Sequence, residues 1–277
     1  MSFFEKFIIK DRVCVVTGGA GLIGRRHAEA ILEGQGIPVL IDVSKDRLND
    51  AVTFLQGEYP KGIVEAYQVN ITVREELQSL CNRLIDKYGN IYGLINNAAN
   101  NPKVEDHSRN FKSTHFSDFP LEIWNDDISV GLTGAFLCAQ VFGAEMAKQG
   151  CGVIINISSD YGIISPDQRI YRKKGLSDED QVIKPVSYSV VKHGIIGLTK
   201  YLATYWAKQG VRVNTLCPAS LENGQDEEFV RNISELIPMG RMSKPDEYVC
   251  TVLYMLSNAS SYMTGATVVL DGGRTIW

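Results

Sequence analysis

The chain has 277 residues, of which 44% are apolar and 22% are charged, and its net charge is −4. These values are typical of a globular protein with a full core and exclude collagen, coiled coil and general disorder. A slightly acidic chain is poorly suited to nonspecific binding of nucleic acid. No run of 18 apolar residues predicts a membrane span. The chain starts without a signal-peptide pattern and its cysteines show no CxxC spacing, so we expect a reducing cytoplasm.

Short β-branched runs alternate with longer amphipathic stretches. In chain order these predict strand 12–17, helix 25–33, strand 38–42, helix 44–56, strand 64–69, helix 74–88, strand 93–96, helix 122–146, strand 152–158, helix 187–209, strand 211–216, helix 246–256 and strand 267–270. Because strands of continuous Val, Ile and Leu are buried on both faces, this order predicts an α/β fold. We expect a Rossmann-type, doubly wound parallel sheet of about seven strands with helices on both faces.

No repeat, low-complexity tract or interdomain linker interrupts the pattern, so we expect one nucleotide-binding domain over residues 1–277. Two segments, 100–121 and 165–185, lack periodicity. Long irregular loops in a compact domain often carry function, which predicts substrate loops at both places. Variable surface decoration is the alternative interpretation.

A glycine-rich turn, TGGAGLIG at 17–24, joins the first predicted strand to the first predicted helix. Gly18 and Gly21 let the backbone turn tightly and approach a pyrophosphate, and Gly24 lets the helix pack closely on the strand. The unpaired N–H groups at the start of the helix favour phosphate. In this place, after a strand and before a helix, the glycine pattern predicts dinucleotide binding.

Asp42 ends the second predicted strand. An acidic side chain there accepts hydrogen bonds from the adenosine ribose hydroxyls and repels a 2′-phosphate. No Arg or Lys occurs among residues 18–24 to bind that phosphate. We therefore expect NAD as the cofactor, with NADP less favoured. The alternative role for Asp42 is to cap the following helix, for which Ser44 is the better candidate.

Tyr188 and Lys192 are four residues apart on a predicted helix and so share one face. A free phenol has a pKa of about 10, and an ammonium group one turn away favours the phenolate and lowers that pKa. Ser159 follows the fifth predicted strand and NNAA at 96–99 ends the fourth. Both lie at the sheet edge where doubly wound folds bind ligands.

With these residues in place, the sequence resembles the short-chain dehydrogenase/reductase family over essentially its whole length. The matching motifs, in the order of the family, are TGGAGLIG at 17–24, Asp42, NNAA at 96–99, INISS at 155–159, YSVVK at 188–192, VRVN at 211–214 and LDGG at 270–273. The resemblance implies that Tyr188 is the general acid/base. It also implies that Ser159, rather than Ser158, holds the reacting oxygen by a hydrogen bond, and that Lys192 binds the nicotinamide ribose.

The resemblance also implies the cofactor site. Asn70 stands where the family often has an Asp that bonds the adenine amino group, a bond that an Asn carbonyl can also make. The loop from Pro218 is expected to cover the nicotinamide. The full set implied to bind the cofactor is Thr17, Gly18, Gly21, Leu22, Ile23, Gly24, Asp42, Asn70, Ile71, Asn97, Ala98, Ala99, Tyr188, Lys192 and Pro218.

Four features depart from the family pattern. Gly131 stands where the family commonly has an Asn that joins a water-mediated proton path to the lysine, and glycine lacks that side chain. The GxxGxxG spacing is closer to the extended branch that includes nucleotide-sugar epimerases, whereas NNAA and LDGG fit the standard branch. Segment 165–185 is an insertion before the YSVVK motif. Ala219 follows Pro218 where the family has Gly.

Both irregular segments are rich in cations. They are Lys103, His107, Arg109, Lys112 and His115 in the first and Arg169, Arg172, Lys173 and Lys174 in the second. Because guanidinium binds phosphate or carboxylate through two parallel hydrogen bonds, these cations predict an anionic phosphosugar, nucleotide sugar or acid sugar as substrate. A solvated charge run is the alternative, since Asp178, Glu179 and Asp180 follow closely.

Taken together, these features predict an NAD-dependent oxidoreductase that interconverts an alcohol and a ketone on a sugar or other polar substrate. The insertion also loosely resembles dehydrogenases of bacterial surface-glycan genes, including flagellin-modification proteins. The alternatives are a nucleotide-sugar epimerase or dehydratase with tightly held NAD, and a non-catalytic NAD-binding protein.

We expect a small-molecule substrate and neither a nucleic-acid nor a membrane partner. No metal is expected, because the four histidines show no ligand spacing with cysteines or acids. The apolar faces of 122–146 and 187–209 resemble the oligomer contacts of the family, and the tail Arg274–Trp277 is a further candidate contact. They predict a homotetramer or homodimer.

Overall fold

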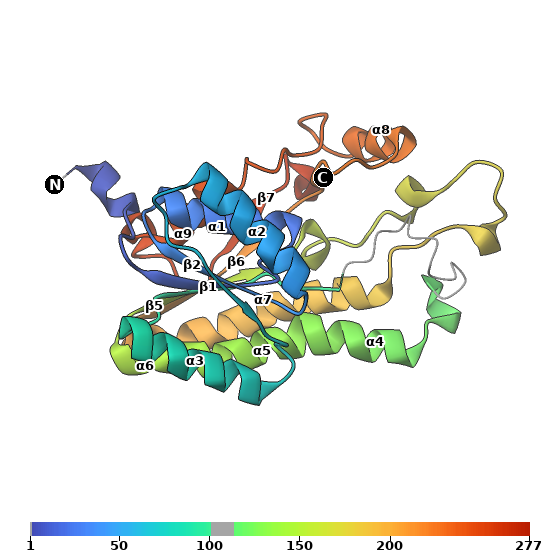
Figure 1. The fold of residues 1–277 in the computed structure, drawn as a ribbon. Coiled ribbons are helices and arrows are strands. Elements are labelled where there is room, and N and C mark those ends of the chain that lie inside the picture. The colour runs from blue at the N-terminus through green and yellow to red at the C-terminus, as the bar shows by residue number, and fades with distance from the viewer. Residues whose placement is uncertain (1, 101–113) are drawn as a thin grey trace.

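The computed structural model describes residues 2–100 and 114–277. Within them, parallel strands form one seven-stranded sheet in the order β3-β2-β1-β4-β5-β6-β7 (Figure 1). The strands are β1 (Val13–Thr17), β2 (Ile37–Asp42), β3 (Glu65–Gln68), β4 (Gly93–Asn96), β5 (Gly152–Ile157), β6 (Val211–Pro218) and β7 (Thr267–Leu270). The predicted Rossmann-type, doubly wound α/β fold is confirmed.

Helices cover both faces of this sheet (Figure 1). They are α1 (Leu22–Glu33), α2 (Lys45–Glu58), α3 (Arg74–Tyr88), α4 (Leu121–Ile128), α5 (Gly134–Cys138), α6 (Ala144–Gln149), α7 (Val186–Trp206), α8 (Glu227–Glu235) and α9 (Val249–Leu256). Helices α1, α2 and α9 lie on one face, and α3 to α7 lie on the other.

Successive residues of the central strands point into two different cores. In β1, Cys14 and Val16 pack with α1, α2 and α9, whereas Val13 and Val15 pack with α3 and α7. All five residues of β1 are buried. Burial on both faces is why the strands read as uninterrupted apolar runs.

The predicted helix 122–146 is a continuous helical run, Leu121–Gln149, with two π-helical turns at Ser129–Thr133 and Ala139–Gly143. Each turn contains a glycine that meets a side chain of α7. A Cβ on Gly131 would lie 2.6 Å from Val191 Cγ1, and one on Gly143 would lie 2.6 Å from the Trp206 ring. By length and hydropathy the run would also suffice to span a membrane, a test that buried core helices pass too, and half of its apolar window is buried inside the fold.

Two segments lie beyond the carboxyl ends of the strands. Segment 165–185 extends away from the sheet (yellow in Figure 1), with short 3-10 turns at Gln168–Tyr171 and Asp178–Asp180. Helix α8, which the sequence pattern did not predict, begins where Asp226 accepts a hydrogen bond from the Phe229 N–H at 2.9 Å. Both segments border the site described next.

Candidate active site

A cavity of about 920 Å³ opens at the carboxyl edge of the sheet. Its walls include Ser159, Tyr188 and Lys192, together with every residue predicted to bind the cofactor except Thr17. A cavity of this size and position suits an extended organic ligand at the switch point of a doubly wound sheet. The structure therefore brings together nearly all of the predicted site residues.

The glycine turn fits closely against the end of β4. Gly18 has a φ of +60°, and a Cβ there would lie 3.0 Å from the Cα of Ala98. A Cβ on Gly24 would lie 2.3 Å from the Gly18 carbonyl oxygen, so only glycine fits where α1 leaves the turn. This leaves an open backbone cradle at the start of a helix, which is the arrangement that a pyrophosphate needs.

Thr17 takes a supporting position rather than the predicted place in the cofactor site. Its side chain is buried beneath the turn and does not line the cavity. Its Oγ1 accepts hydrogen bonds from the N–H groups of Asn97 and Ala98, both at 2.9 Å. Thr17 thus fixes the end of β4 against the glycine turn.

Asp42 is buried at the end of β2 with its carboxylate on the cavity wall. Its Oδ1 accepts hydrogen bonds from the Ser44 N–H at 3.1 Å and from Arg47 Nη2 at 3.0 Å. No hydrogen bond from the described residues reaches its Oδ2. That oxygen suits the ribose hydroxyls of an adenosine, and Ser44 caps α2 as predicted.

Asn70, predicted to bond the adenine amino group, already has hydrogen-bond partners within the chain. Its Oδ1 already accepts from the Thr72 N–H at 3.0 Å and from the Thr72 hydroxyl at 2.8 Å. A carbonyl oxygen has two lone pairs. A bond to an adenine amino group would therefore replace one of these contacts.

The groups predicted to handle the proton come from α7 and from the end of β5. Lys192 Nζ donates to the Ile157 carbonyl at 3.0 Å and lies 5.6 Å from the centre of the Tyr188 ring. The Ser158 hydroxyl donates to the Lys192 carbonyl at 2.7 Å, which ties it to the backbone of α7. The Ser159 hydroxyl instead donates to Asp160 Oδ1 at 2.7 Å.

Burial dominates the electrostatics of these groups. Burial raises the pKa of Tyr188, and the nearby Ser159 hydroxyl opposes that rise. Burial also lowers the pKa of Lys192 to about 8. Burial thus outweighs the effect of Ser159, so the Tyr188 pKa lies above its ordinary value here, and the lowering of that pKa by Lys192 stays a prediction.

Sequence reasoning missed a second ammonium at this site. Lys184 Nζ lies 3.9 Å from the centre of the Tyr188 ring. Burial, followed by the charge of Lys192, lowers the pKa of Lys184 to about 8. Its place four residues before Tyr188 mirrors that of Lys192 four residues after it, a spacing that was visible in the sequence.

An aromatic wall continues from Tyr188 toward α8. The Tyr161 ring meets the Tyr188 ring edge-on at 6.3 Å, and the Tyr161 hydroxyl lies 3.1 Å from the Tyr171 hydroxyl. The Tyr171 ring lies 5.5 Å from that of Phe229. The insertion and α8 therefore complete the substrate end of the cavity.

The predicted cations of the two loops have different outcomes. Lys103, His107, Arg109 and Lys112 lie outside the described residues, and His115 Nε2 lies 3.1 Å from the Gln181 carbonyl. Arg169 pairs with Asp167, and Arg172 pairs with Asp178. The ion pair of Arg169, which does not line the cavity, favours the solvated charge run, whereas Arg172 also lines the cavity. Lys173 and Lys174 line the cavity and make no ion pair with any described residue.

No group of three or more His, Cys, Asp or Glu side chains in the described part of the chain is placed to hold a metal ion. All six cysteines are free thiols.

The chain has recognisable relatives. Residues 19–275 match the family profile described as enoyl-(acyl carrier protein) reductase. An NAD-dependent glycerol dehydrogenase of Listeria innocua is 31% identical, over 99% of this chain and 98% of the relative. A 3-oxoacyl-[acyl-carrier-protein] reductase of Thermotoga maritima is 30% identical, over 97% and 99%. The crystal structure of a short-chain dehydrogenase from Leptospira borgpetersenii with bound NAD+ has a TM-score of 0.83 at 30% identity, over 99% and 96%.

The chain belongs to the short-chain dehydrogenase/reductase family. It is an oxidoreductase of that family, acting on CH–OH groups with NAD or NADP. The predicted resemblance to flagellin-modification proteins is also confirmed, since such a protein of Campylobacter coli is 27% identical over 96% of this chain and 99% of its own length.

Proposed function

We propose that this enzyme is an NAD-dependent dehydrogenase that interconverts a secondary alcohol and a ketone on a small polyol or sugar. The observation that carries the proposal is that Ser159, Tyr188 and Lys192 meet at one end of a cavity whose other end holds Asp42. The relative that oxidises glycerol with NAD supports the same choice of substrate class and cofactor.

The residues of this chain divide the work of the reaction. A nicotinamide held at this site would supply the hydride chemistry. Tyr188 Oη takes the proton of the substrate hydroxyl during oxidation and returns it during reduction. Ser159 Oγ holds the reacting oxygen beside Tyr188. Lys192 holds the ribose, and the aromatic wall that begins at Tyr161 keeps water from the reacting centre.

An absorbance assay for NADH against a panel of substrates tests this function. We expect oxidation of at least one neutral polyol or sugar alcohol with NAD. The panel includes 3-oxoacyl thioesters, assayed as reductions, because one relative acts on that class. Stoichiometric NAD that stays with the purified protein, without net NADH production, would instead favour the epimerase or dehydratase.

The preference for NAD is expected to depend on the contact between Asp42 and Arg47. Replacing Asp42 by Ala removes the carboxylate that repels a 2′-phosphate and releases the Arg47 guanidinium beside it. We expect the ratio of kcat/KM for NADP to that for NAD to rise about a hundredfold, since charged hydrogen bonds contribute about 1.5–3 kcal/mol. In the Asp42→Ala/Arg47→Ala variant most of this gain should disappear. An unchanged ratio in the single variant would contradict the assignment.

An anionic sugar is the second candidate substrate, and the observation that favours it is the pair of lysines, Lys173 and Lys174, on the cavity wall. If the substrate carries a carboxylate or phosphate, the Lys173→Met/Lys174→Met variant should raise its KM roughly tenfold while leaving the KM for glycerol unchanged. Arg169→Ala is the matched control, because this arginine is paired with Asp167 and does not line the cavity. If the KM for the anionic substrate is the same in the double lysine variant and in Arg169→Ala, the neutral polyol remains the better candidate.

We also propose that residues 1–277 work as a single domain in the cytoplasm and assemble as a homodimer or homotetramer. Free thiols in all six cysteines support a reducing compartment. Exposed apolar side chains on α5 and α7, namely Phe136, Val190, Tyr201 and Tyr205, support a contact with a second copy. Light scattering should give a mass of two or four chains, and Tyr201→Glu/Tyr205→Glu should lower it. In the tail Arg274 is buried within its own chain, whereas Ile276 and Trp277 are exposed, so the tail stays a candidate contact.

A further inference from the structure

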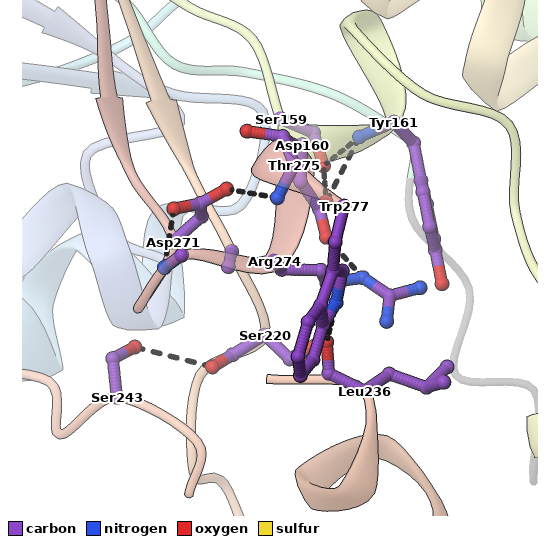
Figure 2. Close-up of polar contacts among 12 residues, drawn as sticks. Ser159, Asp160, Tyr161, Ser220, Leu236, Ser243, Asp271, Arg274, Thr275 and Trp277 are labelled. Carbon is purple, nitrogen blue, oxygen red and sulfur yellow. Dashed lines mark hydrogen bonds and ion pairs between the residues drawn. The ribbon is translucent and has the colours of Figure 1, made fainter. Parts of the chain in front are cut away.

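A buried ion pair connects the end of the chain to the proposed catalytic serine (Figure 2). Arg274 Nε donates to Asp160 Oδ2 at 3.0 Å, and both side chains are at most 4% exposed. Asp160 Oδ1 accepts from the Ser159 hydroxyl at 2.7 Å and from the Tyr161 N–H at 2.9 Å. Asp160 also lines the cavity. The carboxylate is thus an acceptor for three donors, one of which is the catalytic hydroxyl.

The C-terminal segment is built to hold Arg274 in this place. Asp271 follows β7, and its carboxylate accepts from the N–H groups of Gly273 at 2.8 Å and Thr275 at 2.7 Å. Gly273 has a φ of +92° and packs against Pro238. Trp277 Nε1 donates to the Leu236 carbonyl at 3.1 Å (Figure 2). These contacts fix the turn that carries Arg274.

The direction of the hydrogen bonds matters for the reaction. The Ser159 hydroxyl donates its hydrogen to Asp160, and its oxygen accepts from the Tyr161 N–H at 3.2 Å. The hydrogen bonds therefore run from Ser159 and Arg274 to Asp160, and Arg274 balances the charge of that carboxylate. A carboxylate near Tyr188 favours the protonated phenol over the phenolate, so the Asp160 charge raises the Tyr188 pKa.

Other charged or titratable groups also face this centre in the described residues. They are Lys192 on α7, Lys184 just before α7, Asp127 on α4 through its effect on Lys184, Tyr161 after β5, Tyr171 in the insertion and Cys217 on β6 beside Lys192. Among the acids, Asp160 is the one whose charge acts directly on Tyr188. Its charge depends in turn on the partner that Arg274 provides.

We propose that Asp160 and Arg274 are positioning residues that act as a charge pair, orient the Ser159 hydroxyl and control how tightly Tyr188 holds its proton. The inference rests on the proposed function, in which Tyr188 exchanges the proton with substrate. It adds the C-terminal segment to the machinery of the active site.

The test is the pH dependence of kcat for alcohol oxidation, which rises as Tyr188 loses its proton. Asp160→Asn keeps the shape but removes the charge, so the midpoint should move down by about one pH unit. Arg274→Gln leaves the Asp160 charge without its partner. At pH values where Asp160 is ionised, the midpoint of the kcat profile should therefore move up. Asp160→Asn/Arg274→Gln should fall between the single variants, and Arg274→Lys, which keeps the charge, should match the wild type.

A merely structural pair would lower the rate in every variant and leave the midpoint in place, and that result would overturn the inference. Binding of NADH to each variant reports whether the fold is intact. If Asp160→Asn does not fold, Arg274→Gln against Arg274→Lys carries the same test, because only the former removes a charge.

A second measurement does not depend on turnover. The phenolate absorbance near 295 nm, taken as the difference between each variant and its Tyr188→Phe counterpart with NAD bound, should appear at lower pH in Asp160→Asn than in the wild type. Wild-type enzyme without activity on any alcohol would contradict the proposed function. Active wild-type enzyme with an unmoved Tyr188 titration in both charge variants would contradict only this inference.

Discussion

Replacing Tyr188 by Phe should lower kcat by roughly a hundredfold to ten-thousandfold, which is the usual contribution of a positioned general acid/base. The substitution removes one oxygen and leaves the ring, so the edge-on contact with Tyr161 and the two lysines around the ring stay in place. NAD binding should change by less than about threefold, because the proposed function assigns most of the dinucleotide contacts to the glycine turn and Asp42. Initial rates and NADH fluorescence titration measure the two quantities.

Tyr161→Phe is the matched control for this prediction. It also removes one phenol oxygen from a buried ring in the same wall, but the partner of that hydroxyl is Tyr171 rather than the reacting centre. We expect kcat to fall by no more than about tenfold in this variant. Similar losses in the two variants would mean that the wall, and not the proton of Tyr188, carries the effect.

The fold was readable from the sequence because its signals are local. Helix α3 and strands β4 and β7 begin and end at the predicted residues, since their apolar spacing alone defines their buried faces. The π-helical turns of the run Leu121–Gln149 were not readable, because they lie where Gly131 and Gly143 meet side chains of α7. Helix α8 was missed although Asp226 followed by two glutamates is a capping signal.

The same distinction between local and long-range signals applies to the residues of the site. Ser159, Tyr188 and the glycine turn could be predicted because each stands at a fixed place relative to a strand or helix, and the structure brings them to one cavity. The partnership of Asp160 with Arg274 joins positions 114 residues apart, and no periodicity links such positions. The rise in the Tyr188 pKa could not be predicted either, because the burial of a phenol depends on tertiary packing and not on the YSVVK motif.

The stability of the enzyme should fall steeply as the pH drops from 6.5 to 4, and His27 on α1 should account for a large share of that fall. His27 is fully buried, and neither ring nitrogen has a hydrogen-bond partner of good geometry in the described residues. Burial lowers the pKa of His27 from 6.5 to about 4, and the nearby Asn97 side chain opposes this only in part. The folded imidazole is therefore neutral at pH values where the unfolded one is already charged.

The sign follows from proton linkage. Between pH 6.5 and 4 the unfolded chain binds a proton at this position that the folded chain does not bind, so the free energy of unfolding decreases as the pH falls. A shift from 6.5 to about 4 corresponds to about 3 kcal/mol for the whole interval, at 1.36 kcal/mol per pKa unit. Below pH 4 this contribution is fully lost, and above pH 6.5 it is fully present.

His27→Leu should remove this part of the slope, because a leucine of similar volume has no proton to bind. Urea unfolding at a fixed protein concentration, repeated at several pH values from 4 to 7, gives the slope for each variant. His193→Gln is the matched control, since it removes a histidine that is exposed on α7 rather than buried. Acid-labile carboxylates contribute equally to all three proteins, so the difference between them isolates His27. If His27→Leu loses stability with falling pH as steeply as the wild type and His193→Gln do, the buried imidazole does not govern the acid sensitivity.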